Sequence, residues 1–434
     1  MMNRLLIGTI IALSASATAL GAPHLPETTG TTSESAPRKS RLSIGGYGEA
    51  VMTRNFFSDS YLRYTTPENY KKSSHGRFDI PHMVIFLGYD FGKGWSMSSE
   101  IEFEHGGTES AIEIEPEEAG EYESEIERGG EVALEQFWIQ KSFMPQFNVR
   151  AGMLVVPVGQ TNAHHMPTEF FGVYRPEGEN TIMPCTWHEV GLSLWGQAGD
   201  WRYEAMFLPG LDSDRFGNQG WIHDGAGSPY EFKIANRYAA AVRVDNTSIP
   251  HLRLSVSGYI GDSFSNTLYP TDGKNVSGVH GTVAIGSFDF AYTHRNLIAR
   301  GHFDYGHLSD AKAITDFNMG MSKNSVSKRQ RIGSAAIATG IEAGYNVLSL
   351  VNGYAQSPQR LFVFGRYDYY DSQYKMEHDP KNEWCHRQRI AAGLNYYPIP
   401  QIVVKGEYSI GLLDKRYNNE PSISLGIAYS GWFL

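Results

Sequence analysis

The chain has 434 residues, a formal net charge of −10 and only two cysteines. Cys185 and Cys385 show no C-x-x-C spacing, which excludes a zinc or thioredoxin-like motif. Beyond residue 22 no segment approaches the about 18 consecutive apolar residues of a membrane-spanning helix.

The amino terminus has the three parts of a secretory signal peptide. Arg4 makes residues 1–4 basic, residues 5–13 are apolar, and residues 14–22 are small and contain the cleavage pattern Ala17-Thr18-Ala19. Residues 23–40 are rich in Thr, Ser, Pro and Glu. We therefore predict a signal peptide over 1–22, a disordered leader over 23–40 and one folded domain over 41–434.

From residue 41 onward, the chain contains short runs in which apolar and polar residues alternate with period two. This alternation is typical of strands. In the first clear hairpin, residues 83–89 and 95–103 flank a turn at 91–94. Similar hairpins are predicted over 190–207 and 394–408, with Gly or Pro at the joints.

Long polar stretches separate these hairpins, at 55–77, 105–131, 157–187, 209–235, 262–276, 296–333 and 371–384. Short turns alternating with long loops are typical of bacterial outer-membrane barrels. Between 42–54 and 421–434 we predict about sixteen strands in a transmembrane antiparallel β-barrel, with fourteen or eighteen as alternatives. Sixteen strands leave a water-filled channel. A secreted β-sandwich or propeller is the other class considered.

The last stretch, 421–434, predicts the strand that closes the barrel. One parity carries apolar residues, and the other carries small or polar ones; the apolar set is Ile423, Leu425, Ile427, Tyr429 and Phe433. Aromatic residues near a strand end suit a membrane interface. We therefore expect the apolar parity to contact outer-membrane lipid.

Two segments within 149–196, VRAGMLVVPVGQTN and FFGVYRPEGENTIMPCTWHEVGLSLWG, resemble the phosphate-selective porin O/P family. Its pattern of R-x-G followed by P-[FV]-G is met by Arg150-Ala151-Gly152 and Pro157-Val158-Gly159. HGRFDIPHMVIFLGYDF and ALEQFWIQKSF are similar too. The resemblance implies a sixteen-stranded, trimeric channel in which one loop folds inward, and by position that loop is 157–187.

Basic residues on the parity opposite the lipid-facing set are predicted to line the pore, because a charge facing hydrocarbon costs about 2–4 kcal/mol. They are Arg150, Arg202, Arg243, Arg253, Arg366, Arg387, Arg389 and Lys405. Acidic residues two positions away accompany several of them, as Asp245 accompanies Arg243. Mixed walls of this kind favour a general porin over a phosphate-selective one.

Acidic residues are concentrated in one segment. Residues 100–135 hold fourteen glutamates and one arginine, a local charge of −13, so the remaining chain carries −10 − (−13) = +3. We predict an acidic mouth that attracts cations, formed by Glu100, Glu102, Glu104, Glu113 and Glu115. A solvated surface loop is the plain alternative. Clustered carboxylates also suit Ca²⁺ or Mg²⁺, although no D-x-[DN]-x-[DN]-G loop is present.

The predicted constriction loop carries His164, His165, Arg175, Glu177 and Glu179. The histidines are interpreted as polar loop residues, since a metal site needs three or four converging ligands. Arg175, Glu177 and Glu179 are candidates to anchor the loop to the wall by ion pairs. Cys185 and Cys385 are expected to be separate thiols; a disulfide requires the loop to cross the bore.

Together these patterns predict an outer-membrane porin, general or weakly selective, for small hydrophilic solutes or ions, and a homotrimer. Phosphate or anion selectivity is the alternative within this class, and a barrel enzyme or adhesin lies outside it. No cofactor and no nucleic-acid partner are expected. No G-x-S-x-G, H-E-x-x-H or Walker A motif is present, which favours a non-enzymatic channel.

Overall fold

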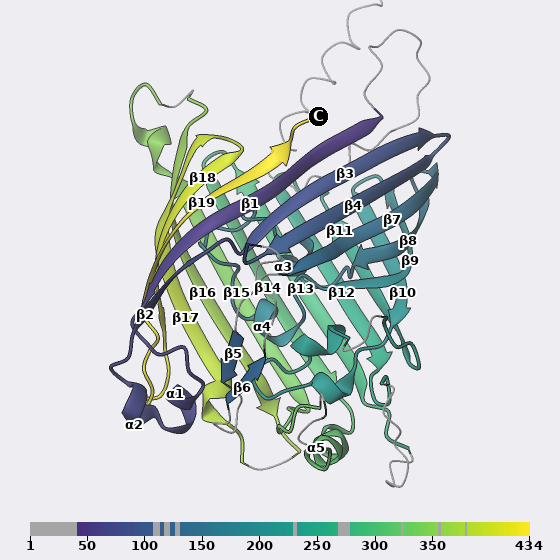
Figure 1. Cartoon of the computed structure of the whole chain (residues 1–434). Helices are drawn as coiled ribbons and strands as arrows, with labels where there is room; N and C mark the ends of the chain where they lie inside the picture. The colour runs from purple at the N-terminus through teal and green to yellow at the C-terminus, as the bar shows by residue number, and fades with distance from the viewer. Residues whose placement is uncertain are drawn as a thin grey trace, which may run out of the picture.

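The computed structural model describes residues 41–434 except 107–112, 117–121, 126–130, 229–231, 268–277, 323–324, 326, 355–356 and 378–379. Its antiparallel strands close into one barrel (Figure 1). The sheet contains 17 strands, but the short β2 and β3 together occupy one place in the wall, since β1 pairs with each in turn. The wall is therefore sixteen strands around, which confirms the predicted fold class. The predicted signal peptide and leader lie outside the described residues.

The first half of the barrel contains β1 (Leu42–Asn55), α1 (Leu62–Thr65), α2 (Pro67–Tyr70), β2 (His75–Asp79), β3 (His82–Gly92), β4 (Trp95–Glu104), β5 (Glu113–Pro116), β6 (Tyr122–Glu125), β7 (Val132–Met144), β8 (Phe147–Val155), α3 (Gln160–Ala163), α4 (Glu179–Ile182), β9 (His188–Ala198) and β10 (Trp201–Pro209). β5 and β6 form a separate hairpin outside the wall.

The second half contains the 3₁₀ turns η1 (Ser213–Arg215) and η2 (His223–Ala226), then β11 (Tyr238–Asn246), β12 (Leu252–Asp262), β13 (Thr282–His294), β14 (Leu297–Leu308), α5 (Ala311–Met319), β15 (Ala335–Asn346), η3 (Val347–Leu350), β16 (Arg360–Lys375), η4 (Glu383–Cys385), β17 (His386–Ile399), β18 (Ile402–Gly411) and β19 (Ser422–Trp432).

The final strand closes the barrel, as predicted. β19 pairs with β1 in a continuous antiparallel register from Gly45 opposite Trp432 to Asn55 opposite Ser422. Phe433 extends this ladder, because its N–H donates to Ile44 O at 2.7 Å. The closure leaves neither edge of the sheet unpaired.

Most long connections lie at one end of the barrel, the loop end, and the short turns lie at the other, the turn end (Figure 1). The exception is the connection 347–359, which joins β15 to β16 at the turn end. One predicted loop is wrong: 296–333 contains β14, which pairs with β13 and β15 along its whole length. Its alternation is hidden because its inward positions include charged residues such as Arg300 and Asp304, and its outward positions include Gly301. A further long connection, 412–421, was not predicted.

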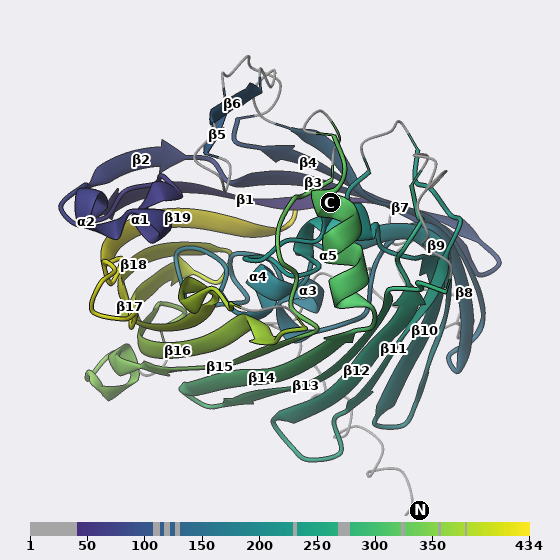
Figure 2. The same ribbon diagram turned by 90° about the horizontal axis from the view of Figure 1, so that it is seen from below.

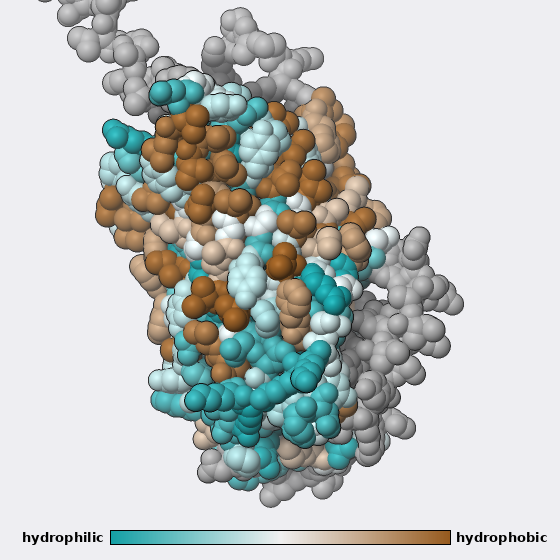
Figure 3. Space-filling model, turned by 90° about the vertical axis from the view of Figure 1, so that its left-hand side faces the viewer, coloured by the Kyte–Doolittle hydropathy of each residue, from teal (hydrophilic) through white to brown (hydrophobic). Residues whose placement is uncertain are grey.

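The outer face of the wall is apolar. Outward positions such as Leu192, Val256 and Leu425 are between 44% and 61% exposed, whereas their polar neighbours in sequence are buried or half-buried. Figure 3 shows hydrophobic residues gathered over the upper part of one face and hydrophilic ones over the loop end. Within the described part of the chain, no helix is long and apolar enough to cross a membrane.

Three connections fill much of the lumen: L3 (156–187), L4 (210–237) and L6 (309–334). Figure 2 shows α3 and α4 inside the ring of strands and α5 across its loop end. An apolar core joins these connections to the inner wall and includes Trp187 of L3, Trp221 of L4 and Ile314 of α5, none of them exposed. Only L3 was predicted to fold inward, so the inward course of L4 is a correction.

Small residues on the inner wall make room for these connections. A Cβ atom on Gly306 of β14 would lie 2.1 Å from the Trp221 ring, and one on Gly344 of β15 would lie 2.4 Å from the Phe171 ring. Both contacts are closer than a side chain tolerates. The glycines thus allow an aromatic side chain from each loop to pack directly against the wall.

The lipid-facing surface is tested by charging one residue of an apolar row. Val256 lies half-way along β12 and pairs with Val244 and Phe288, which are also exposed. We expect Val256→Arg to destabilise the barrel in lipid vesicles. The free energy of unfolding should fall by about 2–4 kcal/mol, the cost of a cation at the bilayer midplane. Val256→Leu is the matched control and should stay near wild type. Equal stability of V256R and wild type in urea titrations would contradict the outward-facing assignment.

Candidate functional site

L3 leaves the wall after β8 and returns to it at β9, and one side chain ties its two ends together. The Asn162 amide donates to Val156 O at 2.6 Å and accepts the Trp187 N–H at 2.5 Å. Glu179 orders the start of the loop, because its carboxylate accepts the N–H groups of Gln160, Thr161 and Asn162 at 2.8, 2.8 and 3.2 Å. The loop is therefore held in shape by its own contacts.

The tip of L3 is bound to the wall formed by β15 to β18. Lys405 donates to Phe170 O at 3.0 Å and to Gly172 O at 2.7 Å, and Asn395 donates to Phe171 O at 3.0 Å. The Phe171 ring stacks on Phe364 with centroids 5.4 Å apart. Lys405, predicted to line the pore, therefore uses its ammonium group to hold the loop.

L3 also contacts the wall formed by β1, β3 and β7. Met166 packs against Tyr47 and Phe86 of β1 and β3. His165 Nε2 lies 3.4 Å from Glu135 Oε1 of β7. L3 is rooted at β8 and β9, which lie half-way round the ring of strands from β17, where Asn395 holds its tip. L3 therefore crosses the bore.

A chamber of about 340 Å³ lies beside L3. Glu100 and Trp138 line one side, Arg150 and Arg243 line another, and Asp200 brings the chamber to the turn end. Its ionisable lining comprises four arginines, five acidic residues and two histidines. Positive and negative groups thus face the same space from different strands.

Each predicted pore-lining base lies on the inner face and has an oxygen partner. Arg150 and Arg202 meet Glu204 at 2.5 and 3.0 Å, and Arg243 and Arg253 share Asp289 at 2.9 and 3.1 Å. Asp245 also meets Arg243 at 2.8 Å and Arg202 at 3.6 Å, so these four arginines share three carboxylates. Each cation therefore has an anionic neighbour, which makes its burial tolerable.

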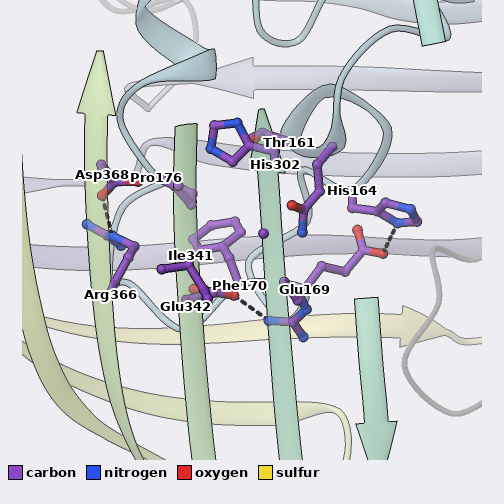
Figure 4. Close-up of a pocket in the computed structure, with 14 residues that line it drawn as sticks. Thr161, His164, Glu169, Phe170, Pro176, His302, Ile341, Glu342, Arg366 and Asp368 are labelled. Carbon is purple, nitrogen blue, oxygen red and sulfur yellow. Dashed lines mark hydrogen bonds and ion pairs between the residues drawn. The ribbon is translucent and has the colours of Figure 1, made fainter. Parts of the chain in front are cut away.

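A second, smaller cavity of about 30 Å³ lies on the other side of L3 (Figure 4). Arg366 and Asp368 of β16 project into it and are paired at 2.9 Å. His164 and Glu169 of L3 line both this cavity and the chamber, and their side chains are 3.0 Å apart. These two residues therefore separate the two spaces.

Arg387 and Arg389 lie nearer the loop end, around Glu420. The Glu420 carboxylate meets Arg63 at 2.9 Å, Arg387 at 2.8 Å and Arg389 at 3.4 Å. Arg389 also meets Glu177 of L3 at 2.8 Å. This cluster joins the connection 56–74, L3 and the connection 412–421.

The structure divides the predicted acidic mouth into two parts. Glu100, Glu102 and Glu104 lie on β4, and Glu102 is 4% exposed and accepts a hydrogen bond from His82 at 2.7 Å. Glu113 and Glu115 lie on the separate β5–β6 hairpin. The rest of the acidic run lies largely outside the described residues. The side chains of Glu113 and Glu115 lie outside the described part of the chain, so the acidic mouth stays a prediction.

The remaining loop residues make internal contacts. Arg175 donates to His165 O and Thr186 Oγ1, both at 3.3 Å. Cys185 and Cys385 are separate thiols, and the buried Cys385 Sγ lies 3.3 Å from Asn218 O of L4.

Solved porin structures share the overall fold of this chain. No protein-family model matches the sequence. An uncharacterised protein of Aquifex aeolicus (strain VF5) is 26% identical over 378 residues, which cover 85% of this chain and 76% of that protein. Salmonella typhi OmpF, solved in complex with daunomycin, has a TM-score of 0.53 at 11% identity and covers 90% of this chain and 97% of its own. The anion-selective porin from Comamonas acidovorans has a TM-score of 0.50 at 10% identity and covers 90% and 99%. The fold is that of an outer-membrane porin.

The residues that sequence reasoning missed are mainly the partners of the predicted bases. Glu204, Asp289 and Glu342 are inward acids on β10, β13 and β15, and Arg300 pairs with Glu342 at 2.5 Å. Their inward parity was a usable signal, because a charged residue between two outward apolar ones faces the lumen. The inward position of Glu135 is harder to predict from the sequence, because the alternation of β7 is interrupted between Leu134 and Gln136.

The loop-end cluster predicts a pH dependence. Burial raises the pKa of Glu420, but Arg387 and Arg63 outweigh it and hold that pKa at about 2. Because the folded pKa is below the unfolded value of about 4.3, the contribution to stability is full above pH 5 and is lost as pH falls toward 2. We expect hydrogen exchange in residues 56–74, corrected for intrinsic rates, to show constant protection from pH 7 to 5 and falling protection below pH 4.

Glu420→Gln should remove that protection at pH 7 and abolish its pH dependence. Breaking a buried pair costs about 3–5 kcal/mol because the arginines lose their anion. Glu383→Gln is the control, since Glu383 pairs with Arg416 at an exposed site. Wild-type protection in E420Q at pH 7 would show that the cluster does not hold the loops.

Proposed function

We propose that this chain forms a narrow diffusion channel in the outer membrane for small hydrophilic solutes or ions, with weak selectivity. The observation that carries the proposal is the polar chamber beside L3 inside a porin-like barrel. A dry lumen would have no reason to hold so many inward charges, because each is costly to bury unless it is paired or solvated.

Weak selectivity follows from the balance of charge. Four arginines and five carboxylates line the chamber, and the arginines form ion pairs with wall carboxylates. A phosphate-selective channel would need basic groups free to bind the anion. The resemblance to the phosphate-selective porin O/P family therefore supports a porin more strongly than it supports phosphate as the solute.

Passage would be limited where L3 narrows the lumen. His164 and Glu169 border both the chamber and the smaller cavity, so a permeating solute would pass beside this pair. The narrow bore favours ions and small solutes over large ones. Assembly as a trimer belongs to the same proposal and is supported by the resemblance alone.

Planar-bilayer recording of the purified, refolded barrel tests the proposal. We expect discrete conductance steps in 1 M KCl. A correctly folded barrel that inserts and stays silent would instead support the enzyme or adhesin alternatives. Insertion is verified independently by protection of the strands from protease in the same vesicles.

One chamber arginine tests whether the wall charges set ion preference. Arg253→Gln removes a positive charge but leaves Asp289 paired with Arg243. A unit charge about 8 Å from an ion in water is worth about 0.5 kcal/mol, which is about twofold in permeability. Losing the charge should favour cations and disfavour anions by this amount each, so the cation-to-anion permeability ratio should rise about fivefold at low salt. The effect should shrink in 1 M salt because the Debye length falls to about 3 Å.

Reversal potentials under a KCl gradient give this ratio. Arg416→Gln is the matched control, because Arg416 is half-exposed at the loop end and pairs with Glu383. An unchanged ratio in R253Q would mean that ions do not pass through the chamber.

A further inference from the structure

A β-bulge turns one additional carboxylate into the lumen. Gln136 pairs with Glu100, but the next pair along is Leu134 with Ile101, so Glu135 is an extra residue on β7. Leu134 and Phe137 face outward, and both Glu135 and Gln136 between them face inward. Bulges re-aim side chains in this way and are common beside functional sites.

The Glu135 carboxylate is completely buried and lacks hydrogen-bond donors. Its side chain is 0% exposed, and neither Oε1 nor Oε2 receives a hydrogen bond. A buried carboxylate without donors is costly, so a positively charged ligand at this position would remove a real penalty.

His165 of L3 faces this carboxylate in the orientation of a metal ligand. Its Nδ1 lies 3.0 Å from Asn162 O, which can only accept, so Nδ1 carries a proton and donates it. Metal-binding histidines are held by the same kind of bond on the second ring nitrogen. Nε2 lies 3.4 Å from Glu135 Oε1, the spacing of two ligands each about 2.1 Å from one tetrahedral ion.

Glu100 of β4 completes the group. One ligand atom each from Glu100, Glu135 and His165 lies within 4.8 Å of the others. Gln136 lies directly opposite Glu100 in the register of β4 and β7. Glu100 and His165 also line the chamber, which gives an ion a route to the site.

We propose that Glu100, Glu135 and His165 bind a divalent first-row transition-metal ion, with water as the fourth ligand. The imidazole nitrogen favours such an ion over Ca²⁺ or Mg²⁺, which take oxygen ligands. Because His165 belongs to L3 and the carboxylates belong to the wall, the bound ion joins the loop to β4 and β7.

Two neighbouring groups explain why the site is placed here. The adjacent group of His82, Glu102 and Glu104 is the other candidate beside it. There His82 and Glu102 are already hydrogen-bonded to each other at 2.7 Å, whereas the Glu135 carboxylate has no hydrogen-bond donor. Arg175 is the nearby cation of L3, but it donates to His165 O and Thr186 Oγ1. The alternative explanation of the 3.4 Å approach between His165 Nε2 and Glu135 Oε1 is a proton between the two groups. That explanation predicts no metal binding.

The proposal is tested by titrating the full-length refolded barrel in detergent with Zn²⁺ and measuring the heat of binding by calorimetry. We expect one equivalent of Zn²⁺ to bind and EDTA to remove it. Glu135→Gln keeps the side-chain shape but removes the charge, and it should weaken binding more than about tenfold, since even supporting residues of metal sites are worth about that much. His165→Gln, in the loop rather than the wall, should do the same if E135Q does not fold.

Glu383→Gln is the matched control, because Glu383 is an exposed carboxylate at the loop end that pairs with Arg416. It should bind Zn²⁺ like the wild type. Absence of tight binding by the wild type, equal affinity in E135Q, or loss of binding in E383Q would each overturn the proposal. The measurement needs no ion conduction, so its outcome is independent of the channel proposal.

Discussion

Backbone N–H and C=O groups inside a bilayer find no water, so a chain that crosses it in strands has to pair both edges of its sheet. Here that requirement is met where β19 pairs with β1 over the length from Gly45 to Asn55. Closure then divides the side chains into two sets with different surroundings. The outward set is apolar, and the inward set carries nearly all the charges discussed above. The lumen, with its loops and ion pairs, exists only because the ladder is continuous.

Inside the lumen the balance is between filling the space and solvating charge. L3 and L4 bury an apolar core against β10 to β15, with Trp187 and Trp221 unexposed. Away from that core, inward arginines pair with acids from neighbouring strands, as Arg243 does with Asp289. Pairing offsets the cost of removing each charge from water. The chamber beside L3 is the part of the lumen that neither apolar packing nor ion pairing has closed.

L3 connects these features because it contacts separate parts of the wall. Lys405 holds its tip by two backbone carbonyls, while His165 approaches Glu135 on β7. A loop fixed at two parts of the wall narrows the bore without needing a rigid helix of its own. A metal ion at His165 would strengthen the second attachment and would couple the shape of the narrowest part to the ions in solution.

Much of this architecture was predictable from the sequence. Period-two alternation determined which side chains face outward, and turn chemistry determined most of the hairpins. The tertiary structure alone decided which charges meet: Arg243 and Asp289 are 46 residues apart and come together across strands. It also decided that L4 folds inward. The glycine at position 306 on the inner wall is consistent with this, because it leaves room for the Trp221 ring of L4. Alternation is a local property of the backbone. The ion pairs instead depend on the register between strands, and the inward loops depend on the path of segments whose sequences have no period.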